Sequence, residues 1–437
     1  MASITEIGEA MHRVLTISPE QAGRVSGFVK RQSKLTAAKF VQTTVLGFLG
    51  DPQTTLAQLA QIATAVGAPI TRQAIEQRFT REAAVLLECV LNAAVREVIA
   101  SDPAAIPLLQ RFSAVILQDS SIINLPDALA ELWRGCGGTN GTHAAALKID
   151  VRLDVLNGTL CGPLLKHGRT QDRSSSSREA PLPERALYVA DLGYFKLPRL
   201  SEIGEGRAFF LTRLFLQTAV FDEQGKELDL LRLLEESQGP VELPVRIGSK
   251  ERLAVRLLAV PVPEEVANRR RQRLKEEARR RGRAASKKTL ALAAWTILVT
   301  NVPAEMLSLQ EALVLLRVRW QIELLFKLWK DGGKVDEWRS ENPWRILCEV
   351  YAKLTGMVIQ HWLFLVSFWS RPDRSWVKGA QTVRDNVALL ATAMADLIEI
   401  GVAIGQITRC LAGGCRMDKR KKHPHTYQLL LEFQDAA

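Results

Sequence analysis

The chain has 437 residues, 47% of them hydrophobic, and its formal net charge at pH 7 is +11. This length exceeds what one hydrophobic core usually holds, so we expect two to four domains. The basic excess favours a polyanionic partner, with nucleic acid first and an anionic membrane surface second. The six cysteines include no C-x-x-C pair, and no histidine stands at zinc-ligand spacing, which argues against a zinc module and predicts reduced thiols.

The chain shows no sign of membrane attachment. Its first residues lack the basic-then-apolar pattern of a signal peptide. The apolar run at residues 350–369 is interrupted by Lys353, Gln360 and His361, so we do not expect a transmembrane span. We therefore expect a cytoplasmic protein.

Residues 1–105 are predicted to be helical. Residues 55–66 follow a Pro-Gln-Thr-Thr cap signal, Gly67-Ala68-Pro69 interrupts the pattern, and residues 71–79 resume it. Two helices around a short turn are the outline of a helix-turn-helix, and a packed helical subdomain has the same outline. In a helix-turn-helix, Arg72 and Arg78 of the second helix would contact DNA.

Residues 106–215 are predicted to form a sheet, and an acidic residue follows each of two of its strands. The expected strands are residues 114–117, 145–155, 159–165, 186–190 and 208–215, with a Ser- and Pro-rich loop over 171–183. Asp119 comes shortly after the first strand and Asp191 directly after the fourth. Functional groups gather beyond the carboxyl ends of strands in α/β sheets, although a lone Asp more often caps a helix or turn.

Residues 216–290 predict a β-rich segment and a basic helix. Strand-like runs cover residues 218–221, 241–247 and 253–260, a helix is expected over 264–288, and a strand containing Trp295 is expected over 290–299. The helix has eleven Arg or Lys residues against four Glu. With so few balancing acids, phosphate contact by residues such as Arg270 and Arg273 is favoured over a solvated surface.

Residues 319–330 predict one helix, free of Gly and Pro. At about 100° per residue, Arg319, Glu323, Phe326 and Lys330 share one narrow strip. The flanks of this strip are apolar: Leu313, Trp320, Leu324 and Leu328 on one side, and Val318, Ile322, Leu325 and Trp329 on the other. A helix that is apolar nearly all round is buried, so the charged strip should face a polar cleft. A salt-bridged surface stripe is the alternative. Beyond this helix, residues 346–412 are predicted to be helical and apolar.

Asp119, Asp191 and Glu323 together suit metal-dependent chemistry. Three converging carboxylates can hold two divalent cations about 4 Å apart, which suits in-line phosphoryl transfer. One cation lowers the pKa of the attacking water or 3′-hydroxyl, and the other stabilises the leaving oxygen. Ligands that are all oxygen favour Mg²⁺ or Mn²⁺.

Several of these segments resemble the bacterial insertion-sequence DDE transposases that carry the YREK signature. The resemblance extends from about residue 110 to the C-terminus. The matching parts are Asp119, residues 190–195, residues 295–303, the spacing of Arg319, Glu323 and Lys330, and the tail from Arg420. Leu316 stands where the signature has Tyr, and Leu cannot hydrogen-bond a terminal phosphate as Tyr would.

The resemblance implies an α/β fold with an RNase H-like mixed sheet flanked by helices. A β-rich insertion would separate the second Asp from the Glu, and the 132 positions from Asp191 to Glu323 leave room for it. The expected domains are a helical DNA-binding domain at 1–105, a catalytic core at 106–215 and 291–345, the insertion at 216–290, and a helical, dimer-forming region at 346–437.

The resemblance also implies an activity. A homodimer on double-stranded DNA would nick transposon ends, pass through a DNA hairpin and transfer 3′ ends into target DNA. Asp119, Asp191 and Glu323 would be catalytic and would bind two Mg²⁺ or Mn²⁺ ions. The protein would be bacterial, cytoplasmic and associated with the nucleoid, without a membrane partner.

DNA contacts would come from several basic side chains and one aromatic ring. Arg319 and Lys330 would hold phosphates near the cleaved end, and Trp295 would stack on a flipped base, unless it is only a core residue. Arg213 would either reach the DNA or be a surface arginine with no role in DNA binding. The remaining expected DNA contacts are Lys327 and Lys421.

Three other interpretations stay open. A nuclease of the same fold would cut without joining ends. A DNA-binding regulator without chemistry is favoured by Leu316 and opposed by the three acids. A membrane-surface protein would bind liposomes in preference to duplex DNA.

Overall fold

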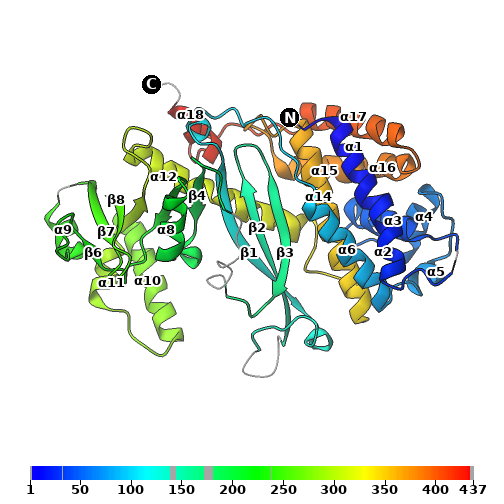
Figure 1. Ribbon diagram of the computed structural model, residues 1–437, viewed down its shortest axis with the longest axis horizontal. Coiled ribbons are helices and arrows are strands. Elements are labelled where there is room, and N and C mark those ends of the chain that lie inside the picture. Colours follow the sequence, from blue (N-terminus) through cyan, green and yellow to red (C-terminus); the bar gives the residue numbers. More distant parts are fainter. Residues whose placement is uncertain (1, 32, 138–143, 172–180, 238, 434–437) are drawn as a thin grey trace. The chain divides into compact units, whose positions relative to one another are not determined.

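The computed structural model describes residues 2–31, 33–137, 144–171, 181–237 and 239–433. Its internal contacts divide the chain into two compact units, and many of their elements are labelled in Figure 1. Unit 1 comprises Met1–Ile106, Asp119–Thr170 and Trp320–Gln428, and unit 2 comprises Pro107–Gln118, Gln171–Arg319 and Leu429–Ala437. Most of the loop expected over residues 171–183 lies outside the described residues.

Unit 1 consists mainly of helices. They are α1 (Ile4–His12), the π-helical η1 (Arg13–Ile17), α2 (Ser18–Val25), α3 (Ala37–Gly50), α4 (Leu56–Ala65), α5 (Arg72–Glu76), α6 (Arg81–Arg96), the 3-10 turn η2 (Asp127–Leu129), α13 (Trp320–Lys327), the π-helical η5 (Leu328–Gly332), α14 (Pro343–Ser367), α15 (Trp376–Asp385), α16 (Val387–Ala393) and α17 (Leu397–Gly414). The last helix, α18 (Thr426–Glu432), begins in unit 1.

Hydroxyl side chains begin the N-terminal helices. Ser3, Thr36, Thr55, Thr71 and Thr80 each accept a hydrogen bond from a backbone N–H in the first turn of α1, α3, α4, α5 and α6. These bonds satisfy donors that a helix start leaves without an intrahelical partner. The local sequence therefore fixes where these helices start.

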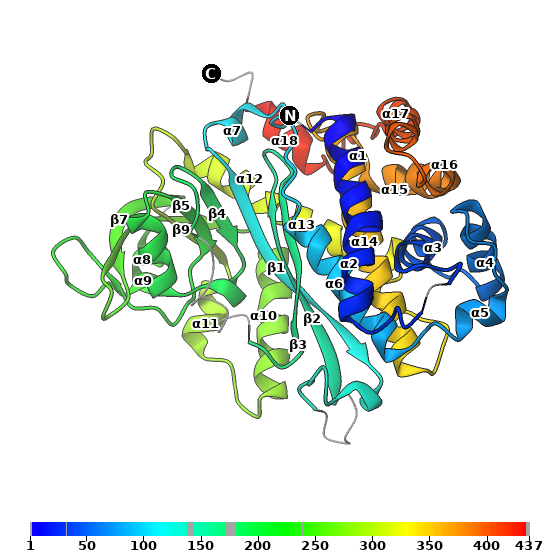
Figure 2. The same cartoon turned by 45° about the vertical axis from the view of Figure 1, so that its right-hand side comes forward.

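The long helix α14 is the core of unit 1. Figure 2 shows α3 and α6 beside it, and both pack against it. Its residues from Ile346 to Leu365 are buried, because a helix that is apolar on nearly every side needs neighbours on nearly every side. Two charged residues in this stretch, Glu349 and Lys353, are buried as well.

The hairpin of β2 (Ala145–Asp154) and β3 (Leu160–His167) is fixed to α14 at its turn. The Gly158 carbonyl lies 2.7 Å from His361 Nε2. Gly158 has a φ of +79°, and a Cβ there would lie 2.2 Å from Leu365 Cδ2, so only glycine fits. Burial lowers the pKa of His361 to about 4, so its ring is neutral in the folded protein.

Nine strands form one sheet in the order β3-β2-β1-β4-β5-β9-β8-β7-β6. The strands not yet given are β1 (Val115–Leu125), β4 (Leu187–Ala190), β5 (Phe209–Arg213), β6 (Val220–Phe221), β7 (Val241–Ile247), β8 (Leu253–Pro261) and β9 (Trp295–Thr300). β1 pairs in parallel with β4, and β4 with β5. The pairs from β5 through β9, β8 and β7 to β6 are antiparallel.

Unit 2 holds the strands β4 to β9 and the first four residues of β1. Its helical elements are α7 (Pro107–Gln110), the 3-10 turn η4 (Leu192–Tyr194), α8 (Leu197–Glu205), α9 (Leu230–Glu236), α10 (Glu264–Arg280), α11 (Lys287–Leu292) and α12 (Leu309–Val318). One apolar cluster, which includes Phe210, Leu234, Ile247 and Val299, joins β5 and β9 to the strands and helices between them. The segment between β5 and β9 therefore extends the sheet and shares its core.

This architecture confirms the predicted fold class, an RNase H-like mixed sheet with helical regions. Several predicted element boundaries were wrong. β1 continues well past residue 117, and the helix expected over 264–288 divides into α10 and α11 around Gly282, which has a φ of +67°. The strand expected over 290–299 begins only at Trp295, because residues 290–292 belong to α11. The second helix of the predicted helix-turn-helix is short, Arg72–Glu76.

One helix within the described ranges, α17, meets the length and hydropathy criteria for crossing a membrane. Its mean hydropathy is 1.2, and 33% of it is buried inside the protein.

Candidate active site

Two of the predicted acids follow paired positions of neighbouring parallel strands. In the register of β1 and β4, Gln118 lies opposite Ala190. Asp119 is the next residue of β1, and Asp191 is the first residue after β4. Because Gln118 and Ala190 are paired, this register aligns the residues directly before the two acids. Asp119 belongs to unit 1 by its contacts and Asp191 to unit 2.

These two acids differ in their local hydrogen bonds. Asp119 Oδ1 accepts a hydrogen bond from the Ser120 N–H at 2.8 Å. Asp191 is the N-cap of η4, but its carboxylate makes no capping hydrogen bond to the described residues of that turn. Its backbone carbonyl instead accepts from the Tyr194 N–H at 2.9 Å. The Asp191 side chain therefore does not cap the turn, although an Asp at such a position commonly does.

The third acid, Glu323, lies on α13 and is half-buried. The helix predicted over 319–330 is interrupted: α12 ends at Val318, Arg319 is its C-cap, α13 ends at Lys327, and π-helical turns follow. The predicted burial of both apolar flanks was wrong on one side, where Trp320 is 56% exposed and Leu324 is 47% exposed. Leu328 on the same flank is buried, and periodicity alone could not show that the flank is covered at Leu328 and exposed at Trp320 and Leu324.

Lys330, at the other end of the predicted strip, ties this helical segment to β1. Its ammonium donates a 2.9 Å hydrogen bond to the Ile122 carbonyl and lies 3.9 Å from Asp336 Oδ2. Phe326, also expected on the polar strip, is buried and packs edge-on against Trp329. Phe326 therefore belongs to the core, and the charged residues of the strip are Arg319, Glu323 and Lys330. Lys327 is exposed.

The three acids provide the ligand chemistry of a hard divalent cation, since all their donor atoms are carboxylate oxygens. Among the described residues, no group of three or more His, Cys, Asp or Glu side chains is placed to hold a metal ion. Asp119 and Glu323 belong to unit 1 and Asp191 to unit 2. Metal binding is therefore favoured by two observations: the carboxylate oxygens of the three acids, and the register of β1 and β4.

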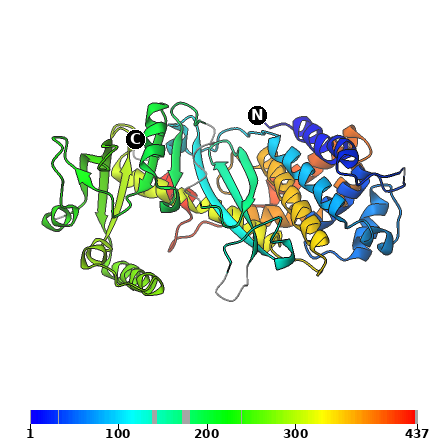
Figure 3. The same ribbon diagram turned by 60° about the horizontal axis from the view of Figure 1, so that its bottom comes forward.

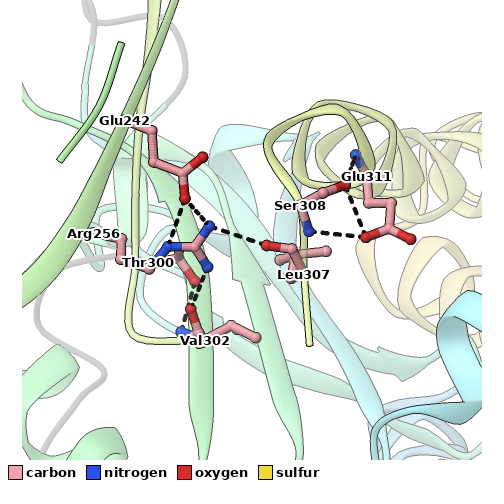
Figure 4. Close-up of polar contacts among 7 residues, drawn as sticks. All are labelled: Glu242, Arg256, Thr300, Val302, Leu307, Ser308 and Glu311. Atoms are coloured by element: carbon pink, nitrogen blue, oxygen red, sulfur yellow. Dashed lines mark hydrogen bonds and ion pairs between the residues drawn. The ribbon is translucent and has the colours of Figure 1, made fainter. Parts of the chain in front are cut away.

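A half-buried arginine fixes the start of α12, the helix that leads toward Glu323 (Figure 4). Arg256 of β8 donates to the carbonyls of Val302, at 2.5 Å, and Leu307, at 3.0 Å. Its guanidinium also holds Glu242 of β7 through bonds of 3.2 and 2.5 Å. One side chain therefore links two strands of the insertion to the connection between β9 and α12.

A second set of bonds fixes the first turn of α12. Ser308 and Glu311 form a reciprocal capping box, also drawn in Figure 4. Arg111 pairs with Glu311 at 2.8 Å and donates to the Met306 carbonyl at 2.9 Å. Burial alone would raise the pKa of Glu311, but the hydrogen bonds from Arg111 and Ser308 outweigh it and lower the pKa. Glu311 therefore stays ionised.

Unit 2 contains a pocket of about 260 Å³ lined by four residues that the sequence predicts to contact DNA. They are Arg213 at the end of β5, Arg270 and Arg273 on α10, and Trp295 at the start of β9. Leu192, the residue after Asp191, also lines it. Residues more than 80 positions apart in sequence, such as Arg213 and Trp295, thus meet in one cationic pocket with an aromatic wall.

Arg270 is held rigidly inside this pocket. It donates to the Trp295 carbonyl at 2.9 Å and to Thr296 Oγ1 at 3.0 Å. Burial first, and the nearby positive charge of Arg213 second, lower the pKa of Arg270. Neither arginine forms an ion pair with any described residue, so the two like charges are balanced by no carboxylate. An arrangement of this kind attracts an anion.

The basic helix α10 is largely exposed, with only Ala267 buried. Figure 3 shows it, in yellow-green, extending away from the strands of unit 2. Arg271 pairs with Glu264 and Arg281 with Glu277, each at 2.6 Å. The basic residues of this run that make no ion pair with the described part of the chain are Arg269, Arg270, Arg273, Lys275, Arg279, Arg280, Arg283 and Lys287.

The two arginines predicted for a helix-turn-helix differ in their surroundings. Arg72 is exposed on α5. Arg78 donates to Ser33 Oγ at 3.2 Å and lies over the Phe28 ring at 5.6 Å, so it packs within unit 1. α5 packs against α4, which itself packs against α3, and both a helix-turn-helix and a packed helical subdomain contain such contacts.

Sequence reasoning missed Arg256. Nothing in its surroundings along the chain distinguishes it from other arginines on strands, since its partners Val302 and Leu307 are 46 and 51 residues away. Sequence reasoning also missed the exposure of Trp320, because periodicity does not show which side of a helix its neighbours cover. An aromatic residue directly beside Arg319 in the signature region is the one signal that could have directed attention to it.

A mixed sheet in the order β3-β2-β1-β4-β5, with β1, β4 and β5 parallel, places the protein in the RNase H-like class. Residues 110–359 match the model of the family described as the transposase DDE domain, which is more than half of the chain. The chain therefore belongs to this family, the bacterial insertion-sequence DDE transposases.

Several curated relatives are similar along most of their length. The transposase for insertion sequence element IS231C of Bacillus thuringiensis subsp. berliner is 25% identical over 80% of this chain and 78% of its own. The IS231F transposase of B. thuringiensis subsp. israelensis is 22% identical over 95% of this chain and 91% of its own. The IS1151 transposase of Clostridium perfringens is 23% identical, with 78% and 76% covered.

Proposed function

We propose that this protein cuts DNA at the ends of an insertion sequence and joins the freed 3′ ends to target DNA. The family assignment supports this reaction, because its relatives are named as transposases for insertion sequences. The observation in this chain that carries the site is the register of β1 and β4, which aligns the residues directly before Asp119 and Asp191.

Asp119, Asp191 and Glu323 are the proposed catalytic residues and the ligands of two Mg²⁺ or Mn²⁺ ions. Bound in this way, such ions activate the attacking oxygen and neutralise charge on the leaving oxygen. In the first step, water attacks the phosphorus, the bond to the 3′ oxygen breaks, and that oxygen takes up a proton. In hairpin formation, the freed 3′-hydroxyl would lose its proton and attack a phosphorus of the opposite strand, whose bond to the 3′ oxygen of the flanking DNA breaks; that oxygen takes up a proton. Water would then open the hairpin by attack at the same phosphorus and regenerate the 3′-hydroxyl. In strand transfer, this 3′-hydroxyl would attack a phosphorus of target DNA, whose bond to the target 3′ oxygen breaks, and that oxygen takes up a proton.

The basic groups are proposed to position the DNA. Arg319 and Lys330, spaced from Glu323 as in the YREK signature, would hold phosphates near the cut, without the hydroxyl that Tyr would supply at Leu316. The pocket of unit 2 supports a flipped base against Trp295, because it offers an aromatic wall beside guanidinium groups that no described carboxylate neutralises.

Further DNA contacts are proposed from other exposed basic residues. They are Arg72, Arg213, Arg270, Arg273, Lys327 and Lys421, together with Arg78 if its packing is released. A homodimer on DNA, in the bacterial cytoplasm, fits a reaction that must pair two transposon ends.

Isosteric variants of the three acids test this proposal. Asp119→Asn, Asp191→Asn and Glu323→Gln should each reduce Mg²⁺-dependent cleavage by at least about a thousand-fold, since each removes a charged ligand. The substrate is a duplex carrying the sequences that flank the gene. Binding to that duplex should persist in gel shifts, because the variants leave the proposed DNA contacts intact.

Asp127→Asn is a matched control, since Asp127 is an exposed acid that follows the same strand. It should cleave like the wild type. Full cleavage by any of the three acid variants would overturn the site assignment. Cleavage by the wild type without any joined donor–target product would instead identify a nuclease that lacks strand transfer.

A DNA-binding regulator without chemistry is the second candidate. Leu316 favours it, because it stands where the signature has Tyr. A wild-type protein that shifts end DNA but makes no nick in Mn²⁺ would establish this alternative.

A further inference from the structure

A compact basic loop precedes α18 in unit 1. We define the basic loop as residues 416–425. It carries five basic residues, Arg416 and the consecutive Lys419, Arg420, Lys421 and Lys422, against the single acid Asp418. The four consecutive residues are exposed, and none forms an ion pair with a described residue.

One side-chain amide closes this loop. Gln428 Oε1 accepts hydrogen bonds from the backbone N–H groups of Arg420 and His425, both at 3.1 Å. Its Nε2 donates to the Arg420 carbonyl at 3.2 Å. The Gln428 N–H also donates to the His425 carbonyl at 3.0 Å. A single residue thus binds the backbone at both sides of Lys421 and Lys422.

The start of the basic loop is fixed as well. The Met417 N–H donates to the Asp373 carbonyl at 2.8 Å, and the Ser375 N–H donates to the Cys415 carbonyl at 2.7 Å. The Asp373 carboxylate lies 3.4 Å from Arg416 Nε. At the other end, the rings of His425 and Tyr427 stack with centroids 5.8 Å apart.

Four adjacent cations repel one another and usually leave a chain segment frayed. Here the bonds from Gln428 hold the backbone in one shape, so part of the entropy cost of ordering the loop is already met before a partner binds. A preformed row of ammonium and guanidinium groups matches the regularly spaced phosphates of duplex DNA. A membrane surface fits less well, because the exposed part of the loop offers no large apolar side chain to insert.

We propose that the basic loop is a preformed phosphate-binding element for duplex DNA and that Gln428 is its positioning residue. The proposal deepens the proposed function, from which it takes only DNA as the partner. The bound phosphates belong either to the transposon end or to target DNA, and the experiment separates these two sources.

The test measures the affinity of the full chain for two duplexes as a function of salt concentration. One duplex carries the sequences that flank the gene, and the other is unrelated. The double variant Lys421→Gln/Lys422→Gln should lower the slope of log K against log salt by about 2, near 0.9 for each phosphate that the loop no longer neutralises. Gln428→Ala keeps every charge, so its slope should stay near the wild-type value. It should nevertheless weaken binding about three- to ten-fold, because the loop must then be ordered on binding.

Gln406→Ala is the matched control, because Gln406 is exposed on α17. It should leave affinity and slope unchanged. An effect confined to the flanking-sequence duplex assigns the loop to the transposon end, and an equal effect on both duplexes assigns it to DNA backbone in general.

Three results would overturn the proposal. The first is wild-type affinity for a folded Gln428→Ala protein. The second is an unchanged slope for the double lysine variant, which breaks none of the loop's own hydrogen bonds and so tests the idea even if Gln428→Ala does not fold. The third is tighter binding to phosphatidylserine vesicles than to either duplex. All three concern binding, so they are independent of whether Asp119, Asp191 or Glu323 variants lose cleavage.

Discussion

At the scale of single residues, the pair Arg213 and Arg270 shows a conflict between binding and stability. Arg213 helps to lower the pKa of Arg270, which means that the folded protein keeps two like charges near each other. Arg213→Gln should therefore raise the thermal unfolding midpoint slightly while it weakens DNA binding. Thermal melts and gel shifts of the same preparation measure the two effects.

Arg246→Gln, an exposed arginine of β7, is the control for general loss of charge. It should not raise the melting midpoint as Arg213→Gln does. A lower midpoint for Arg213→Gln would show that this side chain stabilises the fold, and the pocket would then not be a site of unrelieved repulsion. Opposite signs for stability and binding are typical of functional sites.

Lys353 is a second residue whose surroundings have a measurable consequence. It is 1% exposed on α14 and donates to the carbonyls of Lys334, at 3.1 Å, and Glu337, at 2.7 Å. Burial lowers its pKa to about 8, against the opposing pull of Glu349, Glu337, Asp336 and Asp51. Its ammonium also lies 3.8 Å from Glu349 Oε2.

The depressed pKa predicts how stability depends on pH. An unfolded lysine has a pKa near 10.4, so between pH 8 and that value the unfolded chain binds more protons at this site than the folded one. The free energy of unfolding should therefore gain up to about 3 kcal/mol from Lys353 as the pH rises through this window. Below pH 8 both states are protonated, and this gain is absent.

Urea unfolding of wild type and Lys353→Met at pH 7.5 and pH 10 measures this effect. In the variant, the free energy of unfolding should lack the rise with pH that comes from Lys353. Comparing the two proteins cancels the contributions of all other titrating groups. Lys250→Met, at an exposed turn residue, should keep the wild-type dependence. Parallel pH profiles for wild type and Lys353→Met would contradict the prediction.

At the scale of elements, the contacts of Arg256 predict that the insertion supports α12. Arg256→Met leaves the carbonyls of Val302 and Leu307 and the carboxylate of Glu242 without this donor. We expect a loss of about 2 kcal/mol in stability, together with slower cleavage, because the segment before Glu323 is no longer fixed. Chemical denaturation and single-turnover cleavage measure the two effects.

Glu242→Gln separates the roles within this network. It removes the ion pair but keeps the two bonds to carbonyls, so it should cost much less than Arg256→Met. If both variants lose stability equally, the ion pair rather than the carbonyl bonds holds the connection. If Arg256→Met cleaves at the wild-type rate, the insertion does not position this segment.

The elements also show which parts of the fold local sequence determines. The start of α4 was predicted to within a residue, because Thr55 and Gln58 form a capping box from neighbouring positions. The strand β7 was also predicted at its observed bounds, because the strand-like run of residues 241–247 is itself a local signal. The interruption at Arg319 and the length of β1 depend on which neighbours cover them, and periodicity carries no information about neighbours distant in sequence.

At the scale of the whole molecule, the resemblance to insertion-sequence transposases predicted the RNase H-like sheet and the family. Asp119 and Asp191 were predicted as site residues from their places after expected strands. Asp119 instead lies within β1, and the strand register aligns the residues directly before the two acids. The pocket that joins Arg213, Arg270 and Trp295 could not be predicted, because it forms only when β5, α10 and β9 are assembled. The same holds for Gln428, which acts on backbone groups up to eight residues away.

The antiparallel pairing of β9 with β5 has a consequence for attempts to shorten this protein. Leu211, Thr212 and Arg213 of β5 pair with Thr300, Val299 and Leu298 of β9, so the segment from β6 to β9 shields what would otherwise be a bare sheet edge. Naked edges recruit strands from other chains and promote aggregation. A minimal version trimmed of this segment would need a substitute strand there, and truncation libraries should keep β9 even where they discard α9 and α10.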